Sequence, residues 1–207
     1  MADTLYSQAL TTQTRIKNRL KITTSSLDTV LIRLINAYTD FIEGECNRKF
    51  LRQTFTNEVY SVPEFGMRYL QLKQGEVTSI SSISYRAGTP STPNYTAFTT
   101  DQYELLEDGK SGIVRIYDAL PYGVNAIRVT YTAGYLFDFT NFGTATHTLP
   151  ADLTEVCEQL VIRALRRSEA YGKATEGFDG ATVTWSTDLD ADQKRILDGY
   201  RRGPAFV

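Results

Sequence analysis

The chain has few of the residue types that build catalytic and metal sites. Its 207 residues include one histidine, His147, and two cysteines, Cys46 and Cys157. His147 lies in a threonine-rich stretch without Cys, Asp or Glu at ligand spacing, so we interpret it as a loop residue. Both cysteines fall in predicted helices, which favours small buried apolar residues over a disulfide or a reactive pair. We therefore expect no metal and no cofactor.

The chain also lacks a large excess of either charge and any long apolar run. It carries 22 Lys and Arg against 24 Asp and Glu, a net charge of −2. Proteins whose main affinity is for nucleic acid phosphates usually carry a clustered excess of Lys and Arg, so bulk DNA binding is not expected. No window approaches the roughly 20 apolar residues of a membrane span, and the N-terminus has no signal-peptide run. These absences predict a protein made and kept in the cytosol.

Enzyme motifs are matched only in part. Gly109-Lys110-Ser111 resembles the end of a phosphate-binding loop, but Glu104 stands at the position of the first glycine and a hairpin follows instead of a helix. Acids on such an exposed hairpin are usually solvated rather than catalytic. The acids concerned are Asp101, Glu104, Glu107 and Asp108. The sequence therefore predicts no enzyme and no catalytic residue.

Helical periodicity marks several segments. A short basic helix is predicted from Thr11 to Leu20, and a longer one from Ser25 or Ser26 to about Asn47. A further helix opens at Pro150 and runs to about Tyr171. A last amphipathic helix follows residue 188, with aspartates at its start and arginines at its end. The basic residues of the first helix face either water or an acidic surface on a partner, and they are Arg15, Lys17, Arg19 and Lys21.

The two longer helices carry apolar stripes and are expected to pack as one antiparallel core. The residues expected to form this core are Leu31, Leu34, Ile35, Ile42, Leu153 and Leu160. Val30 and Phe41 are placed on the same buried side. Thr39 and Glu43 are placed on the side that faces water or another subunit.

Between Phe50 and Phe142 short runs of Val, Ile, Thr, Tyr and Phe alternate with Gly, Pro and Asn. This composition is typical of an antiparallel sheet or a small barrel. Asp108-Gly109 is predicted to form a hairpin turn. The predicted strands are Thr54–Ser61, Tyr69–Leu72, Val77–Tyr85, Tyr103–Leu105, Ile113–Tyr117 and Ala126–Thr132.

The predicted fold class is α+β, with an antiparallel helical base, an inserted antiparallel β module and a C-terminal extended or helical arm. The base comprises residues 1–50 and 149–171, the β module 51–148 and the arm 172–207. The arm contains a glycine-broken stretch, and the segment after it, from Ala181 to Thr187, is expected to be extended. Its helix is too short to fold alone, so it would have to bury its apolar face on this subunit or on a partner.

The segment from Leu10 to Phe50 resembles the opening of the head–tail connector proteins of tailed bacteriophages, the adaptors that complete the head beneath the portal. The matching positions in its second helix are Leu31, Leu34, Ile35, Asn36, Ala37, Ile42, Glu43, Arg48 and Phe50. The resemblance returns, in the order of that family, at VTSISSISY (77–85), IRVTYTAGY (127–135) and LPADLTEVCEQLVIRAL (149–165). It covers about two thirds of the chain, and its weight lies in the order and spacing of the pieces.

The resemblance implies a structural virion protein made in the host bacterial cytoplasm and located in the neck. Such adaptors form a ring, usually of twelve subunits, that binds the portal protein, extends the DNA channel and presents a surface to the stopper or tail. DNA would pass through without specific binding. The alternatives are a neck stopper or tail-completion protein and, less favoured, a carbohydrate- or receptor-binding β module.

The arm is the expected portal-docking element. It combines a flexible tether, aromatic residues and arginines that suit carboxylates on a partner. The residues assigned to docking are Trp185, Arg195, Ile196, Leu197, Tyr200, Arg201 and Arg202. Because we expect this helix to become ordered on binding, removal of the residues after Ala181 should leave a folded protein.

Overall fold

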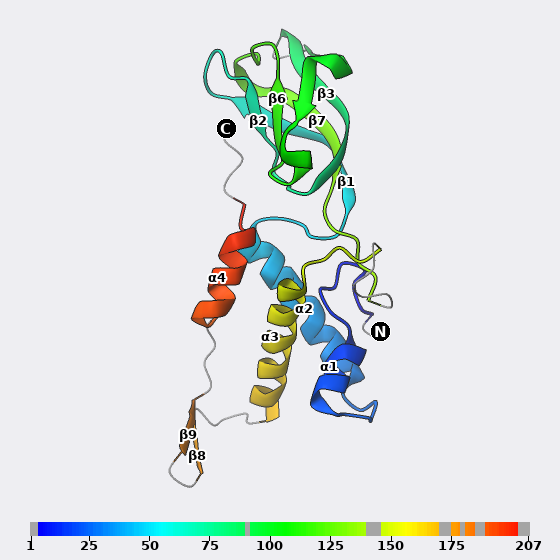
Figure 1. The fold of residues 1–207 in the computed structure, drawn as a ribbon, viewed down its shortest axis with the longest axis vertical. Coiled ribbons are helices and arrows are strands. Elements are labelled where there is room, and N and C mark those ends of the chain that lie inside the picture. The colour runs from blue at the N-terminus through cyan, green and yellow to red at the C-terminus, as the bar shows by residue number, and fades with distance from the viewer. Residues whose placement is uncertain are drawn as a thin grey trace. The chain divides into compact units, whose positions relative to one another are not determined.

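The computed structural model describes residues 4–89, 92–139, 146–169, 175–178, 181–184 and 189–202. The chain divides into two compact units (Figure 1). A helical unit comprises Met1–Cys46 and Phe137–Arg201, and a β unit comprises Asn47–Leu136 and Arg202–Val207. Helices together with antiparallel sheets confirm the predicted α+β class. The prediction placed residues 172–207 in a separate arm, whereas the structure assigns those up to Arg201 to the helical unit.

Helices α1 and α4 of the helical unit begin at side-chain caps that the sequence supplies. Thr12 caps α1 by accepting a hydrogen bond from the backbone N–H of Arg15. Asp190 and Gln193 form a reciprocal capping box at the start of α4, which satisfies two backbone donors. The elements are α1 (Gln13–Leu20), α2 (Asp28–Cys46), α3 (Ala151–Glu169), α4 (Ala191–Tyr200) and the hairpin strands β8 (Thr175–Phe178) and β9 (Ala181–Thr184).

Helices α2 and α3 run in opposite directions and pack against each other (Figure 1). Most of the positions predicted for their shared core are buried, namely Leu31, Ile35, Ile42, Leu153 and Leu160. Leu34 is only half-buried. Helix α4 packs on both α2 and α3, and its Leu197 is 1% exposed. The helical unit thus has one core to which α4 contributes.

The buried face of α2 differs from the predicted one. Val30 and Phe41, expected in the core, are 39% and 41% exposed, whereas Thr39 and Glu43, expected at the surface, are buried. The N-terminal segment covers this side of α2, because the backbone N–H of Leu10 donates to the Thr39 hydroxyl at 3.2 Å. The burial of Thr39 therefore depends on a contact between residues far apart in the chain.

The β unit contains two antiparallel sheets within the described residues. Their strand orders are β1-β7-β3-β4 and β2-β6-β5. Strand β4 lies at a sheet edge and contains Pro93, which cannot donate a ladder hydrogen bond. It was not predicted, because proline argues against a strand. The strands are β1 (Gln53–Val62), β2 (Tyr69–Gln71), β3 (Val77–Thr89), β4 (Thr92–Ala97), β5 (Tyr103–Leu105), β6 (Ile113–Ile116) and β7 (Gly123–Ala133).

Strands β5 and β6 form the hairpin predicted around Asp108-Gly109. The connection is a short 3-10 segment in which Glu107, Asp108 and Gly109 all have positive φ angles of 52°, 50° and 83°. A side chain at Gly109 would collide with the backbone carbonyl of Val77, so glycine is required there.

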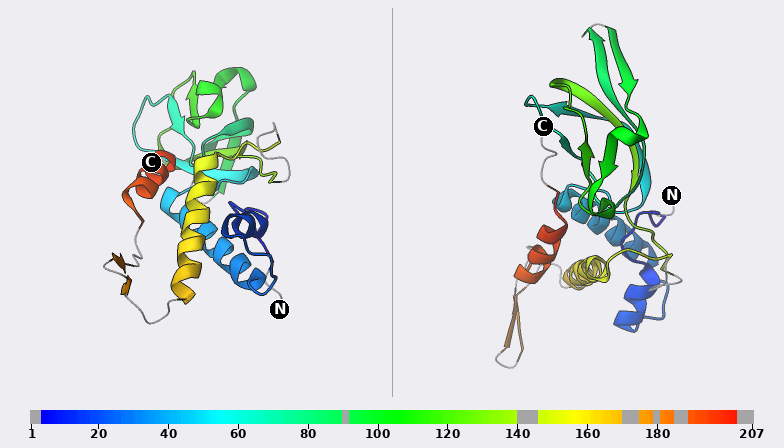
Figure 2. Two further views of the ribbon diagram at one scale, coloured as in Figure 1. Left: turned by 60° about the horizontal axis from the view of Figure 1, so that its bottom comes forward. Right: turned by 45° about the horizontal axis from the view of Figure 1, so that its top comes forward.

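Figure 2 shows the strands of the β unit in two further views. Both of its sheets contribute to one apolar core. Tyr131 and Ile83 lie in it from one sheet, and Val114 and Ile116 from the other. Alternate residues of each strand point inward, which is why single-residue alternation in the sequence located most of the strands.

Candidate functional site

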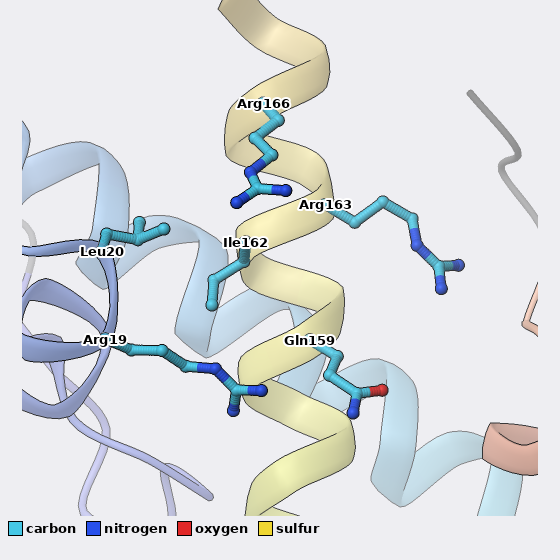
Figure 3. A pocket seen from close by; sticks show the side chains of 6 residues that line it. All are labelled: Arg19, Leu20, Gln159, Ile162, Arg163 and Arg166. Carbon is cyan, nitrogen blue, oxygen red and sulfur yellow. The ribbon is translucent and has the colours of Figure 1, made fainter. Parts of the chain in front are cut away.

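A cleft lies between α1 and α3 in the helical unit (Figure 3). Its volume is about 470 Å³, and it is lined by Arg19, Leu20, Gln159, Ile162, Arg163 and Arg166. Arg19 and Arg166 extend into the space beside the half-buried side chains of Leu20 and Ile162, while Arg163 extends toward α4. The lining offers guanidinium groups around an aliphatic floor and contains no nucleophile. Such a surface suits an acidic or mixed acidic and apolar segment.

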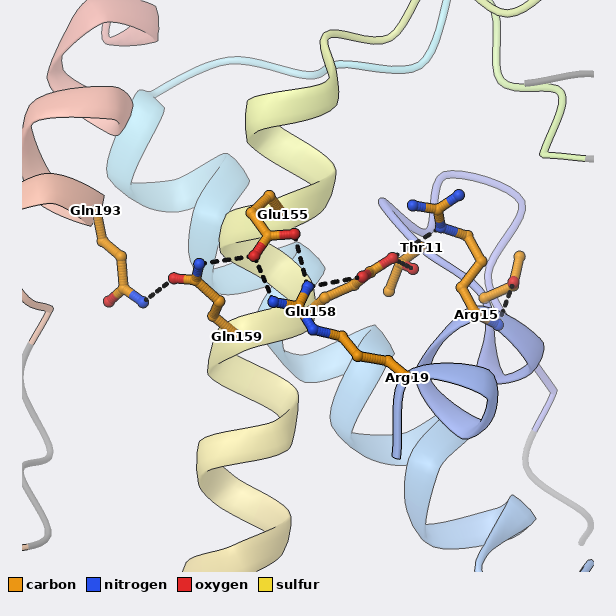
Figure 4. A network of polar contacts seen from close by, with 8 residues as sticks. Thr11, Arg15, Arg19, Glu155, Glu158, Gln159 and Gln193 are labelled. Carbon is orange, nitrogen blue, oxygen red and sulfur yellow. Dashed lines mark hydrogen bonds and ion pairs between the residues drawn. The ribbon is translucent and has the colours of Figure 1, made fainter. Parts of the chain in front are cut away.

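The cleft wall is stabilised by a network of charged hydrogen bonds centred on Glu158 (Figure 4). The Glu158 side chain is 5% exposed and accepts from the Thr11 hydroxyl at 2.9 Å and from Arg15 Nε at 2.7 Å. Arg19 Nη1 also lies 3.2 Å from Glu158 Oε2. Of the basic residues predicted to face water or a partner, Arg15 and Arg19 are instead paired with α3 and Lys17 with Asp28 of α2, while Lys21 is exposed.

Arg19 and Glu155 form a bidentate pair in the same network. Arg19 Nη1 and Nη2 each donate to a separate carboxylate oxygen of Glu155 at 2.6 Å. The hydrogen bond from Arg19 holds the pKa of Glu155 below its ordinary value, and Glu155 in turn raises the pKa of Arg19. Gln159 continues the network to Gln193 of α4, whose Nε2 lies 3.0 Å from Gln159 Oε1. The network therefore connects α1, α3 and α4.

The free positive charge of the cleft is smaller than its arginine count suggests. Arg19 is neutralised by Glu155 and Glu158, and Arg163 Nη2 lies 3.0 Å from Asp190 Oδ2. Arg166 is exposed and forms no hydrogen bond or ion pair within the part of the chain that the structure describes. Arg166 is thus the cleft residue whose charge is available to a partner.

The residues assigned to docking from the sequence do not lie on one surface. Arg195 is exposed and pairs with Asp192, and Ile196 is half-buried. Leu197 is buried in the helical core, and the Tyr200 hydroxyl donates to Asp152 at 2.9 Å.

The two arginines that follow α4 lie in different units. Arg201 pairs with Glu45 at 3.1 Å in the helical unit. Arg202, in the β unit, donates to the backbone carbonyls of Ser111 at 2.7 Å and Lys110 at 2.9 Å. Trp185 lies outside the described residues. Leu197, Tyr200, Arg201 and Arg202 therefore make contacts within the chain itself. Arg195 and part of Ile196 remain accessible on the surface.

The β unit holds a polar cluster that the sequence analysis missed. The hydroxyls of Tyr60 and Tyr131 both donate to Glu58 Oε2, the latter at 2.6 Å. Burial raises the pKa of both phenols, so they remain hydrogen-bond donors at neutral and alkaline pH. Glu58 and Tyr60 are separated by one residue in β1, so their side chains lie on the same face of the strand. This spacing was the feature of the sequence that could have predicted the cluster. The cluster joins the neighbouring strands β1 and β7.

Other candidate chemistry has no geometric support in the described residues. His147 is 6% exposed, its Nδ1 accepts from the backbone N–H of Asp138 at 2.9 Å, and burial lowers its pKa. Within these residues no group of three or more His, Cys, Asp and Glu side chains is placed to hold a metal ion. None of the described helices combines the length and apolarity that a membrane crossing needs.

These features define an α+β protein built from a helical unit and an inserted β unit. The family model for head completion proteins matches residues 9–203. The chain therefore belongs to the head completion protein family, whose members are structural components of the bacteriophage virion. This confirms the resemblance to head–tail connector proteins.

A solved structure with the same fold is described as the neck of an empty GTA particle computed with C6 symmetry. It is 14% identical, the TM-score is 0.57, and the alignment covers 93% of this chain and 90% of that one. Comparison with curated proteins gives no match. The likeness extends over both units, so the fold as a whole is shared.

Proposed function

We propose that this protein is a head–tail adaptor that forms a ring beneath the portal protein, extends the DNA channel and presents the attachment surface for the stopper or tail. The observation that carries the proposal is the family match over residues 9–203, which includes both units and α4. The C6 symmetry of the similar neck structure supports a ring for this chain too. Synthesis in the host bacterial cytoplasm and incorporation into the virion neck follow from this role.

An adaptor works through repeated weak contacts. A ring that engages a symmetric partner binds through many copies at once, so each contact needs little affinity. DNA must slide through such a ring, which a dense lining of free Lys and Arg would hinder. The net charge of −2, together with the pairing of Arg15, Arg19 and Arg163 to carboxylates, supports a channel that does not hold DNA.

The C-terminal segment is proposed to dock on the portal. Arg195 and Ile196 on the open side of α4, together with Trp185, would make the contacts. Leu197, Tyr200 and Arg201 would act indirectly, because their burial and hydrogen bonds hold α4 and the residue after it in place. Arg202 would act indirectly too, through its hydrogen bond within the β unit.

Direct binding to heads tests the adaptor role. DNA-filled heads that carry the portal but no neck protein should bind the purified protein. Binding only to heads that already carry another neck protein would instead assign it as a stopper or tail-completion protein. Binding to neither would contradict both assignments and leave a receptor-binding module.

Variants of α4 test the docking surface separately. Arg195→Glu and Ile196→Glu should abolish binding to heads and leave heads tailless in a complementation assay. Lys194→Glu, an exposed change on the same helix, is the matched control. The melting transitions of all variants should match that of the parent. If the Arg195 and Ile196 variants still join tails, the docking surface lies elsewhere.

A further inference from the structure

Helix α2 carries a second apolar stripe that the described part of the chain does not cover. Val30 and Phe41 are 39% and 41% exposed, Ala37 is exposed and Leu34 is half-buried. These residues follow one another at spacings of 4, 3 and 4, which places them along one line of the helix. Tyr38 packs edge-on against Phe41 with ring centroids 6.3 Å apart. The four residues Val30, Leu34, Ala37 and Phe41 are called the outer stripe.

The outer stripe has the spacing of a helix–helix seam. Alternating steps of 3 and 4 residues bring apolar side chains onto the face that meets another helix. A surface helix normally has one apolar face, and a helix that is apolar on two sides is usually buried on two sides. The inner face of α2, with Leu31 and Ile35, is already occupied by its own chain. We therefore expect a second partner to bury the outer stripe.

The cleft between α1 and α3 is a second surface of the helical unit, and α2 contributes no residue to its lining. Figure 3 shows the lining side chains on α1 and α3, with α2 behind them. The cleft has a floor formed by Leu20 and Ile162 and a volume of about 470 Å³, within the range of about 300–1,000 Å³ typical of binding pockets.

The available charges of the two surfaces are opposite. Most charges around them are already paired within the chain: Lys17 with Asp28, Arg15 and Arg19 with Glu158 and Glu155, and Arg163 with Asp190. Asp40 is exposed next to Phe41 of the outer stripe, and Arg166 is the cleft cation without a partner in the described residues. Oppositely charged rims around apolar centres favour one orientation of docking.

We propose that the outer stripe of α2 in one copy of this protein docks into the α1/α3 cleft of the next copy. Phe41 and Leu34 cover Leu20 and Ile162, and Asp40 faces Arg166. The contact joins two different surfaces, so a docked pair keeps a free cleft on one copy and a free stripe on the other. Repetition of the contact gives a ring when the rotation between copies closes. This inference rests on the proposed ring and names the subunit surfaces that form it.

Pairwise cross-linking tests the contact. Ala37→Cys places a thiol on the outer stripe and Ile162→Cys places one in the cleft, while the natural thiols of Cys46 and Cys157 are buried. Under mild oxidation, a mixture of the two single variants should give a disulfide-linked heterodimer. Thr14→Cys, exposed on α1 away from the cleft, replaces Ile162→Cys as the matched control and should give none. The double variant Ala37→Cys/Ile162→Cys, assembled on heads, should give a ladder of covalent multimers.

A charge exchange provides a second readout. Arg166→Glu should reduce the number of copies bound per head several-fold, and the added change Asp40→Arg should restore it. Purified Arg166→Glu should melt like the parent, because Arg166 is exposed and unpaired in the described structure.

The outcomes separate this inference from the proposed function. If heads carry the protein but the double variant yields no multimers, the contact is wrong and the adaptor role stands. A homodimer formed by Ala37→Cys alone would show that stripe meets stripe, which also overturns the contact. If the protein does not bind heads at all, the proposed function fails, and the heterodimer in solution alone decides whether the contact exists.

Discussion

The thiol of Cys46 donates to the backbone carbonyl oxygen of Leu197 at 3.6 Å, which joins the end of α2 to α4. Both residues are buried. Nearby, the Tyr200 hydroxyl donates to both carboxylate oxygens of Asp152 at 2.9 Å. Helix α4 is therefore part of the core of the helical unit. Removal of the residues after Ala181, expected from the sequence to leave the fold intact, should instead expose this part of α2 and α3.

Replacement of Leu197 by alanine should destabilise the helical unit strongly. Removal of a buried leucine side chain costs about 2–5 kcal/mol, because apolar burial is lost and a cavity remains. Thermal or denaturant unfolding, followed by circular dichroism, measures the loss. Lys194→Ala, an exposed change on the same helix, should lie within about 0.5 kcal/mol of the parent. Equal stability of the two variants would mean that α4 is not docked.

The sequence located the elements because their patterns are local. Alternating β-branched and aromatic residues marked β1, β3 and β7, and Pro150 marked the start of α3. Strand β4 was not predicted, because proline is tolerated in a strand only at the edge of a sheet. Whether a strand lies at an edge depends on the strand order, which a single segment of sequence does not reveal.

The candidate site was less accessible to sequence analysis, since its contacts join distant residues. Arg19 and Glu155 are 136 positions apart, and nothing in the period of either helix predicts their pairing. For the same reason the buried face of α2 was misplaced. Thr39 is polar in sequence but is covered by the N-terminal segment through Leu10. The apolar residues Val30 and Phe41 were assigned to the core because periodicity cannot distinguish an intramolecular partner from a second copy.

The pair of Arg19 and Glu155 should make stability depend on pH in the acid range. Because Arg19 lowers the pKa of Glu155 in the folded protein, the pair stabilises the fold above the unfolded-state pKa of about 4.3. This contribution is lost as the pH falls through the lower folded-state pKa. Glu155→Gln should therefore be less stable than the parent at pH 7, and the difference should shrink as the pH falls below about 4.3. The difference should not exceed about 1 kcal/mol, since both side chains are about 40% exposed.

A matched variant isolates this effect. Glu64→Gln removes an exposed carboxylate that forms no ion pair within the described residues, so its stability should follow that of the parent at every pH. Unfolding curves of the variants and the parent between pH 3 and pH 8 provide the comparison. A Glu155→Gln difference that persists unchanged at pH 3 would show that the carboxylate charge is not its cause.

Loss of the Tyr131 hydroxyl should weaken the β unit. Tyr131→Phe keeps the buried ring but removes a donor 2.6 Å from Glu58 Oε2. Hydrogen bonds to charged groups contribute about 1.5–3 kcal/mol, so a loss of that size is expected. Tyr69→Phe is the control, because Tyr69 is 54% exposed. Urea unfolding of the parent and the two variants measures the difference. If Tyr131→Phe had the same urea midpoint as the parent, water would have replaced the lost donor.

The natural thiols should report the docking of α4 directly. Cys46 and Cys157 are both free and fully buried, and burial raises the pKa of the Cys157 thiol to about 12. A thiol reagent at pH 8 should therefore modify neither residue in the native protein and both in denaturant, since the thiolate is the reactive form.

The Leu197→Ala variant makes this labelling experiment specific to α4. Because Cys46 contacts the backbone of Leu197, loosening of α4 should speed the labelling of Cys46. The rate at Cys157, within α3, should change less. Mass spectrometry of the labelled peptides assigns each rate to its cysteine. Rapid labelling of Cys46 in the parent protein would show that α4 opens readily and that its docking in the helical unit is weak. Equal acceleration of both thiols in Leu197→Ala would show instead that the whole helical unit unfolds together.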